Sequence, residues 1–389
     1  MKSEQLKLEL EKRFWLGTEK IECYFSPGRV NLIGEHTDYN GGYVFPCALS
    51  FGTYLAVRKN NLSQLRFSSG NMSFYNTINL ADLDKKIGKE WVNYPLGVIN
   101  QFVLDGKKLV GLDFYFFGDI PNGAGLSSSA SIEMVTAYAL NELLKYGYDR
   151  ISLIKISQKA ENIFVGVNCG IMDQFASGMG KKDCAIFLNC NTLNYELVPI
   201  VLNNYKIVIA NTNKRRGLAD SKYNERRSEC DRAVEYISKK QPISFLGELH
   251  LDEFLKLQAS IPDETIRRRA MHVVSENERV KDAVSELKAG NILNFGQLMN
   301  ASHDSLKNDY EVTGFELDTL VDEARAIEGV IGSRMTGAGF GGCTVNIVDK
   351  SSIPEFISTV GKAYLEKTGL KADFYVADIG EGSMKISDL

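Results

Sequence analysis

A glycine- and serine-rich segment constrains the fold of this chain more than any other feature. Residues 121–131 have the sequence PNGAGLSSSAS and follow the apolar run 112–117, which is typical of a strand. Apolar residues at helical spacing continue from Ile132 to Leu143. Small residues let a backbone approach a ligand closely, and a helix N-terminus attracts anions. The segment is therefore either an anion site, with serine hydroxyls for a phosphate or a metal, or a serine-capped turn.

Strand and helix patterns alternate irregularly along the rest of the chain. Strands are predicted at residues 21–25, 43–57, 112–117, 186–188, 205–210, 344–348 and 374–376. Helices are predicted at residues 3–14, 132–143, 152–164, 220–239 and much of 263–328. We expect Pro27-Gly28 to break the first strand and Ser152 to cap its helix. Because no regular βαβ rhythm is present, we predict an α+β fold with domains 1–195 and 196–389.

Composition excludes several classes of protein. The 389 residues suffice for about two domains whose cores need no disulfides. The chain has 45 Lys and Arg against 49 Asp and Glu, which gives no sign of a nucleic-acid or membrane partner. No apolar run approaches the ~18 residues of a membrane span, and residues 1–12 lack the apolar core of a secretory signal. Seven scattered cysteines without a CxxC pair are typical of free thiols, so we expect a cytoplasmic protein.

A second unusual segment is SPGRVNLIGEHTDYNGG, residues 26–42. Six polar side chains lie among its glycines, namely Arg29, Asn31, Glu35, His36, Asp38 and Asn40. Such a set of donors and acceptors suits a polyhydroxylated ligand, although a solvated loop would have the same composition. The apolar neighbours Val30, Leu32 and Ile33 favour an interior position, and therefore a ligand site.

The remaining candidate site features are two carboxylates and another glycine-rich segment. Asp173 stands among apolar residues in GIMDQF, residues 170–175, so it is buried with a partner or poised for chemistry. Glu161, in the predicted helix before it, fits the rim of a helix as well as a site. Residues 335–344, MTGAGFGGCT, match GxGxxG, but a strand follows where a dinucleotide site needs a helix. We predict a tight turn that brings backbone against a ligand or another loop.

Together these segments resemble the galactokinase family, in the superfamily of galactokinases, homoserine kinases, mevalonate kinases and phosphomevalonate kinases. PGRVNLIGEHTDYNGG (27–42) is similar to the sugar-binding signature particular to galactokinases. GAGLSSSAS (123–131) resembles the ATP loop of the superfamily, GIMDQF the segment with the catalytic aspartate, and TGAGFGG (336–342) the third glycine motif. The resemblance implies two lobes, a mixed α/β N-terminal lobe and an α+β C-terminal lobe, with the active site between them.

The resemblance also implies a reaction, the ATP-dependent phosphorylation of α-D-galactose at the C1 hydroxyl, giving galactose 1-phosphate and ADP in the Leloir pathway of galactose catabolism. Asp173 would accept the proton or stabilise the transition state, with Arg29 beside it. The implied substrate residues are Glu35, His36, Thr37, Asp38, Asp173 and Tyr223. The implied nucleotide residues are Ser69, Gly123, Ala124, Gly125, Leu126, Ser127, Ser128 and Ser129. Ser129 and Glu161 would bind Mg²⁺, which needs few protein oxygens.

These implications come with expectations about partners. We expect galactose and ATP with Mg²⁺ as the partners, no binding to nucleic acid or membranes, and a monomer. The transfers of Ser69 and Tyr223 rest on surroundings that match the family less closely. Two other functions stay open, a kinase for another sugar such as N-acetylgalactosamine or arabinose, and a galactose and ATP sensor without catalysis. The intact Ser129-Ala130, Arg29 and Asp173 speak against the sensor.

Overall fold

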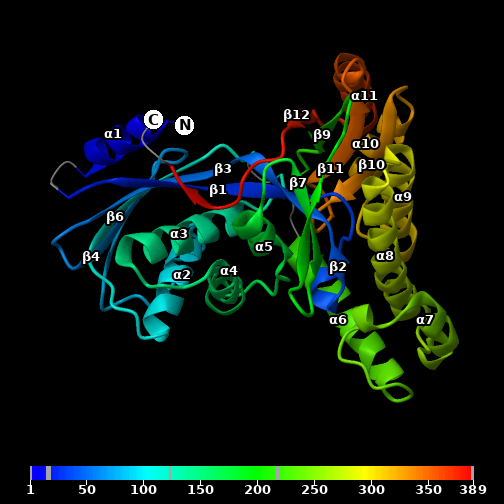
Figure 1. The fold of residues 1–389 in the computed structure, drawn as a ribbon, viewed down its shortest axis with the longest axis horizontal. Helices are drawn as coiled ribbons and strands as arrows, with labels where there is room; N and C mark the ends of the chain where they lie inside the picture. The colour runs from blue at the N-terminus through cyan, green and yellow to red at the C-terminus, as the bar shows by residue number, and fades with distance from the viewer. Residues whose placement is uncertain (1, 15–18, 122–123, 215–218, 387–389) are drawn as a thin grey trace.

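The computed structural model describes residues 2–14, 19–121, 124–214 and 219–386. These residues form two lobes that lie side by side, one coloured blue to teal and the other green to orange in Figure 1. Each lobe is built on a sheet with helices packed against it. The predicted α+β, two-lobed class is confirmed.

Within the described residues, the first lobe has a six-stranded sheet in the order β13-β1-β3-β6-β4-β5. Its strands are β1 (Glu22–Asn31), β3 (Pro46–Lys59), β4 (Gln64–Ser69), β5 (Tyr75–Asn79), β6 (Leu112–Gly118) and β13 (Met384–Lys385). The expected break at Pro27-Gly28 was wrong, because β1 continues through it. The register of β1 with β3 shifts between Pro27 and Arg29, so an irregularity in the pairing accommodates the proline.

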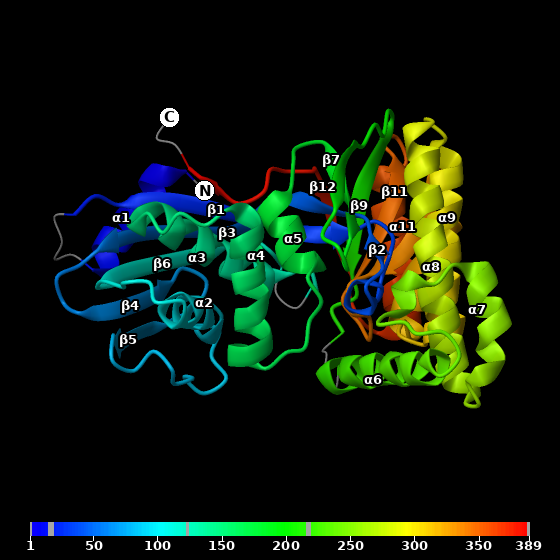
Figure 2. The same ribbon diagram turned by 60° about the horizontal axis from the view of Figure 1, so that its bottom comes forward.

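Helices cover both faces of this sheet (Figures 1 and 2). They are α1 (Ser3–Arg13) on one face and α2 (Asn93–Leu104), α3 (Ser128–Leu144), α4 (Arg150–Lys159) and α5 (Met172–Met179) on the other. The N-cap of α4 is Asp149 and not the predicted Ser152, since the Asp149 carboxylate accepts from the Ser152 N–H. After Lys159 the helix widens into the π-helix Ala160–Val165. This π-helix carries Glu161, and π-helices are frequent at functional sites.

Two further sheets follow among the described residues. One has the order β10-β11-β9-β12 and lies in the second lobe, and the other, β2-β7-β8, lies between the lobes. Their strands are β2 (Tyr43–Val44), β7 (Cys184–Asn189), β8 (Tyr195–Pro199), β9 (Tyr205–Asn211), β10 (Val330–Thr336), β11 (Cys343–Asp349) and β12 (Asp373–Ala377). The predicted boundary near residue 195 falls at the start of β8. The chain later returns to the first lobe, where β13 pairs with β1.

The helices of the second lobe pack in three groups. They are α6 (Ala219–Ser238), α7 (Leu251–Leu257), α8 (Glu264–Lys288), α9 (Ile292–Ser305), α10 (Phe315–Arg325) and α11 (Ile353–Thr368), with short helical turns at Leu246–Glu248 and Gln258–Ser260 and a π-helix at Leu306–Tyr310. Another short helical turn, Asp38–Asn40, lies between β1 and β2. α8 and α9 cover one face of the four-stranded sheet, α10 and α11 cover the other, and α6 and α7 pack against α8. In Figure 2, α6 points toward the first lobe. There Arg227 donates to the Asn168 carbonyl, at 2.9 Å.

Other expectations can be checked on the described residues. All seven cysteines are free, as predicted. None of the helices in the described ranges combines the length and the apolar character needed to cross a membrane. The glycine-rich segment after Met335 is the turn between β10 and β11, and Gly337, Gly339, Gly341 and Gly342 there all have positive φ. The predicted tight turn is therefore confirmed.

Candidate active site

A cavity of about 420 Å³ lies where the four motifs meet. The residues that line it from these motifs are Arg29, Glu35, His36 and Asp38, then Gly125 and Ser127–Ser129, then Gly170, Met172 and Asp173, and last Gly337 and Ala338. Glu161 and Tyr223 line the same cavity. The structure therefore brings together side chains that are up to about three hundred residues apart in the sequence.

Some of the predicted site residues do not line this cavity. The side chains of Ala124 and Leu126 are buried in the apolar core beside β1, so only the backbone of these two residues is available to a ligand. The Thr37 hydroxyl donates to the carbonyls of Gly34 and Tyr43, which fixes the loop. Gly123 lies outside the described residues.

Asp173 is held by two partners at the start of α5. Arg29 Nε donates to Oδ1 at 2.7 Å and Nη2 to Oδ2 at 2.9 Å, a bidentate ion pair with Arg29 almost fully buried. Ser127 Oγ donates to Oδ2 at 2.5 Å. Arg29 Nη1 also donates to the Gly125 carbonyl at 3.0 Å. Burial lowers the pKa of Arg29, but the carboxylates of Asp173 and Glu35 outweigh it and raise that pKa. The pair thus presents an oriented carboxylate beside the serine-rich loop.

Glu35 joins the sugar signature to the glycine turn of the second lobe. Its Oε1 accepts from the backbone N–H of Gly337 at 2.8 Å and from the Thr336 hydroxyl at 3.1 Å. The buried Arg334 lies 3.4 Å from the same oxygen. All these contacts involve Oε1, so Oε2 remains available to accept from a hydroxyl in the cavity.

His36 and Asp38 lie in the same short loop, where His36 is buried and Asp38 is partly buried at the cavity wall. His36 has a positive φ of 61°, and its pKa is lowered to about 3 by burial, so the ring is neutral. Burial and the Asp173 carboxylate raise the pKa of Asp38 to about 7. Gly170 makes room for Asp38, because a Cβ at Gly170 would lie 1.9 Å from Asp38 Oδ2. The loop therefore offers a neutral imidazole and a carboxyl group in close quarters.

Glu161 lies beside Ser129, whose side chain hydrogen-bonds to it. Burial and the Asp173 carboxylate raise the pKa of Glu161 to about 7. Gln174 Nε2 donates both to Glu161, at 2.6 Å, and to the buried Glu133, at 3.0 Å. Burial and Glu161 raise the pKa of Glu133 well above its ordinary value, and Glu133 Oε1 has no hydrogen-bond partner. This excess of buried carboxyl groups fits a divalent cation.

The donor set also limits which cation fits. Over the ranges that the structure describes, no three His, Cys, Asp or Glu side chains converge on a complete metal site. Mg²⁺ commonly takes one or two protein oxygens and keeps phosphate oxygens and water as its other ligands. Ser129 and Glu161 match that pattern better than they match a structural metal cage.

Ser69 lies in a second cavity of about 170 Å³, which shares Ser128, Ser129 and Tyr94 with the first. Its other walls include Trp91 and Phe116, so a larger share of its lining is aromatic than in the first cavity. Ser128 and Ser129 therefore lie between the first cavity, with its charged and polar side chains, and the second cavity, with its aromatic ones.

Sequence reasoning missed several residues of the site. Tyr94 lines both cavities from α2, and Cys169 lines the first. Glu133 and Gln174 make contacts that no local pattern announces, since α3, the π-helix and α5 converge only in the folded chain. Glu133 does follow Ser129 by four residues, which places both on one face of α3, and this spacing could have drawn attention to it.

Comparison with known proteins identifies the family. The galactokinase galactose-binding signature matches residues 10–59, the N-terminal domain of GHMP kinases matches 93–181, and their C-terminal domain matches 283–366. A galactokinase of Fusobacterium nucleatum is 58% identical over 94% of this chain and 95% of its own length. The chain belongs to the galactokinase family. A second galactokinase, from Clostridium acetobutylicum, is 54% identical over 94% of each chain.

Solved structures agree with the assignment to the galactokinase family. The structure of Lactococcus lactis galactokinase complexed with galactose has a TM-score of 0.96 and 46% identity, covering 98% of this chain and 99% of that one. Methanococcus jannaschii mevalonate kinase has a TM-score of 0.65 at 20% identity, covering 94% of this chain and 100% of that one. This second likeness concerns the fold alone.

Proposed function

We propose that the protein transfers the γ-phosphoryl group of ATP to the C1 hydroxyl of α-D-galactose, giving galactose 1-phosphate and ADP in galactose catabolism. The observation that carries this proposal is the meeting of the galactose-binding signature with the Asp173–Arg29 pair in one cavity. The galactose in the Lactococcus lactis relative supports the same substrate here. Glu35, His36, Asp38 and Tyr223 would bind the sugar hydroxyls.

The geometry suits phosphoryl transfer, which depends mostly on positioning and charge neutralisation. The sugar O1–H bond breaks as O1 bonds to the γ-phosphorus, and the bond from that phosphorus to the β,γ-bridging oxygen breaks as ADP leaves. Asp173 would take the proton, because its side chain is 27% exposed toward the cavity while Arg29 and Ser127 fix its orientation. Arg29 also reaches the Gly125 carbonyl, so the same residue couples the acceptor side to the phosphate loop.

The nucleotide would lie across the two cavities. The backbone of residues 124–126 and the N-terminus of α3, with Ser127, Ser128 and Ser129, would hold the phosphates. The aromatic cavity with Ser69, Trp91 and Phe116 would take the base. Ser129 and Glu161 would bind Mg²⁺, which neutralises phosphate charge when bound.

We propose a cytoplasmic enzyme, on the ground of its seven free thiols. We also propose that the protein is a monomer.

A substrate panel tests the function. ADP release is measured with galactose, glucose, N-acetylgalactosamine and arabinose at equal concentrations. Glucose differs from galactose only at C4, and each buried polar group left unpaired by the wrong epimer should cost about 1–3 kcal/mol. Galactose should therefore be preferred strongly in kcat/KM. Comparable values for glucose, or a clear preference for another sugar, would overturn the substrate, and no turnover with any sugar would favour a sensor.

A further inference from the structure

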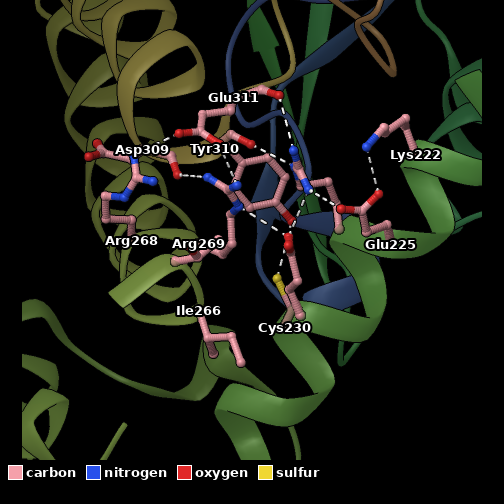
Figure 3. Close-up of polar contacts among 12 residues, drawn as sticks. Lys222, Glu225, Cys230, Ile266, Arg268, Arg269, Asp309, Tyr310 and Glu311 are labelled. Carbon is pink, nitrogen blue, oxygen red and sulfur yellow. Dashed lines mark hydrogen bonds and ion pairs between the residues drawn. The ribbon is translucent and has the colours of Figure 1, made fainter. Parts of the chain in front are cut away.

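Two clusters of polar side chains lie wholly or partly outside the cavity, and they differ in how their charges are balanced. The first joins α6, α8 and Glu311 (Figure 3). Arg268 and Arg269 of α8 pair with Glu311, at 2.8 and 2.7 Å. Arg226 pairs with Glu229 on α6 itself, at 3.0 Å. Each arginine of this cluster therefore has a carboxylate partner, and charges that are paired in this way need no ligand.

The second cluster consists of Glu133, Glu161 and Gln174 and is not balanced in this way. Glu133 and Gln174 are fully buried, and Glu161 is 6% exposed. Over the residues that the structure describes, neither carboxyl group pairs with a lysine or an arginine, and both share one neutral donor instead. Gln174 Nε2 donates to Glu161 Oε2 at 2.6 Å and to Glu133 Oε2 at 3.0 Å. The two N–H bonds of one amide nitrogen thus match two carboxyl acceptors.

The contacts of this cluster close a ring through α3. Glu161 hydrogen-bonds to the side chain of Ser129, and Ser129 lies one turn before Glu133 on α3. The ring therefore joins α3, the π-helix after α4, and α5, which carries Gln174. Cys169 Sγ also lies near Glu161 Oε2, but at 3.5 Å, and a thiol is a weak donor. The shorter contact from the Gln174 amide is therefore the one that holds Glu161 Oε2 in place.

Two members of the ring can act on a ligand only through the other two. Ser129 and Glu161 line the cavity, whereas Glu133 and Gln174 are not among the described residues that line it. Gln174 Oε1 and Glu133 Oε1 are buried and have no hydrogen-bond partner in the described part of the chain. Because a buried oxygen without a partner destabilises a fold, an apolar side chain at position 174 would serve packing alone as well. What an apolar side chain lacks is the donor that holds Glu161.

We propose that Gln174 and Glu133 are positioning residues that orient Glu161 for a divalent cation bound together with the nucleotide phosphates. Glu133 fixes the Gln174 amide from one side, and the amide holds the Glu161 carboxyl group beside Ser129. The inference rests on the proposed function, which assigns the cation to Ser129 and Glu161. Because α5 also carries Asp173, the ring sets the cation ligands and the proton acceptor on one rigid frame.

Calorimetry of ADP binding tests the inference without turnover. The affinity for ADP is measured without sugar over a range of Mg²⁺ concentrations, which gives the concentration of half-maximal effect. Gln174→Met removes both hydrogen bonds and nearly keeps the shape of the side chain, so this concentration should rise by about 10–100-fold. The affinity for galactose, and kcat at saturating Mg²⁺, should stay within about threefold, because Asp173 is unchanged. Galactose binding also reports that the variant is folded.

Two comparisons separate positioning from a general loss of packing. Glu133→Gln keeps an acceptor for the Gln174 amide and should leave the Mg²⁺ requirement within about twofold, whereas Glu133→Met should resemble Gln174→Met. An equal rise in both Glu133 variants would overturn the positioning role of Glu133. The matched control is Gln101→Met, because Gln101 of α2 is 2% exposed and its amide has no partner among the residues described. It should leave the Mg²⁺ requirement within about twofold.

A double-mutant cycle shows whether Gln174 acts through Glu161. In a Glu161→Gln background, Gln174→Met should change the Mg²⁺ requirement by less than about twofold, because the ligand that it positions is already lost. Independent effects of the two substitutions, or a Gln174→Met variant with an unchanged Mg²⁺ requirement, would overturn the inference. ADP binding by the unmodified protein that does not depend on Mg²⁺ would also overturn it. Failure to phosphorylate galactose despite Mg²⁺-dependent ADP binding would instead overturn the proposed function.

Discussion

At the scale of single residues, the chemistry depends on how Asp173 is held. Its two oxygens are bound by Arg29, and one of them also accepts from Ser127. An amide at this position would keep the shape but not the negative charge, and it would present an N–H group to Arg29. The bidentate ion pair with Arg29 therefore orients the side chain of Asp173 and favours a carboxylate over an amide at this position.

Asp173→Asn should reduce kcat by about 10²–10⁴-fold, because an amide cannot accept the proton of the sugar hydroxyl. Galactose and ATP should still bind, with the melting temperature lowered by loss of the ion pair. Rapid-quench measurement of galactose 1-phosphate gives kcat, and calorimetry gives the affinities. A variant that retains more than a tenth of the original kcat would exclude general-base catalysis by Asp173.

The metal proposal makes a separate prediction. Ser129→Ala and Glu161→Gln should each raise the Mg²⁺ concentration that gives half the maximal rate, because the first removes an oxygen ligand and the second replaces a charged carboxylate with a neutral amide. If Ser129 has only a structural role in the first turn of α3, whose N-cap is Ser127, the Ser129→Ala variant should keep the same Mg²⁺ dependence. Initial rates at saturating galactose, titrated with Mg²⁺, decide between these outcomes.

At the scale of elements, the site depends on turns that approach one another closely. Gly170 lies just before α5, and the Asp38 carboxyl group occupies the space that a side chain at this position would need. A Cβ at Gly339 would lie 2.2 Å from the Val312 carbonyl, and this glycine also has a positive φ of 77°. Glycine is therefore needed on both sides of the cavity so that elements of the two lobes can share it.

Gly170→Ala tests this closeness. The added methyl group must displace the Asp38 carboxyl, so we expect the KM for galactose to rise at least tenfold while the KM for ATP changes less than threefold. Gly290→Ala is the control, because Gly290 has a positive φ of 78° and no atom lies within 4 Å of its added Cβ. This control should lose about 1 kcal/mol of stability and keep its galactose KM. Similar kinetic effects of the two substitutions would contradict the argument.

At the scale of the whole molecule, burying the sugar site makes the free energy of unfolding depend on pH. Burial, and then Asp173, raise the pKa of Asp38 from 3.8 to about 7 in the folded protein. Between about pH 4 and 7 the folded state therefore holds a proton that the unfolded state has lost. Through this group, the stability of the ligand-free protein falls as pH rises, by up to about 1.4 kcal/mol per pH unit.

Asp38→Asn removes the titrating group and keeps its shape. The stability of this variant relative to the unmodified protein should therefore increase as pH rises from 4 to 7 and level off above that range. Urea unfolding of both proteins, measured without sugar from pH 4 to 8, gives the difference. A difference that does not depend on pH would contradict the raised pKa.

Much of the fold and of the candidate site could be predicted from the sequence, because the four motifs and the periodic apolar patterns are local features of the chain. Helices and strands with strong periodicity were predicted near their observed positions, and the four motifs contain most of the side chains that line the cavity. The direction in which an individual side chain points could not be predicted from the sequence. Thr37 turns away from the cavity beside a His36 residue with positive φ, and Leu126 turns into the core. Contacts such as Gln174 with Glu133 arise only when three helices converge, so no single segment encodes them.

The pairing of β13 with β1 has a consequence for synthesis on the ribosome. Lys385 reaches Glu22 across 363 positions of the chain. At about 5–20 residues per second, translation needs roughly 20–70 s to span that distance. During this time the N–H and C=O groups of β1 at Tyr24 and Phe25 have no partner strand on that side. On a polysome, this open edge is exposed to pairing with a neighbouring nascent chain.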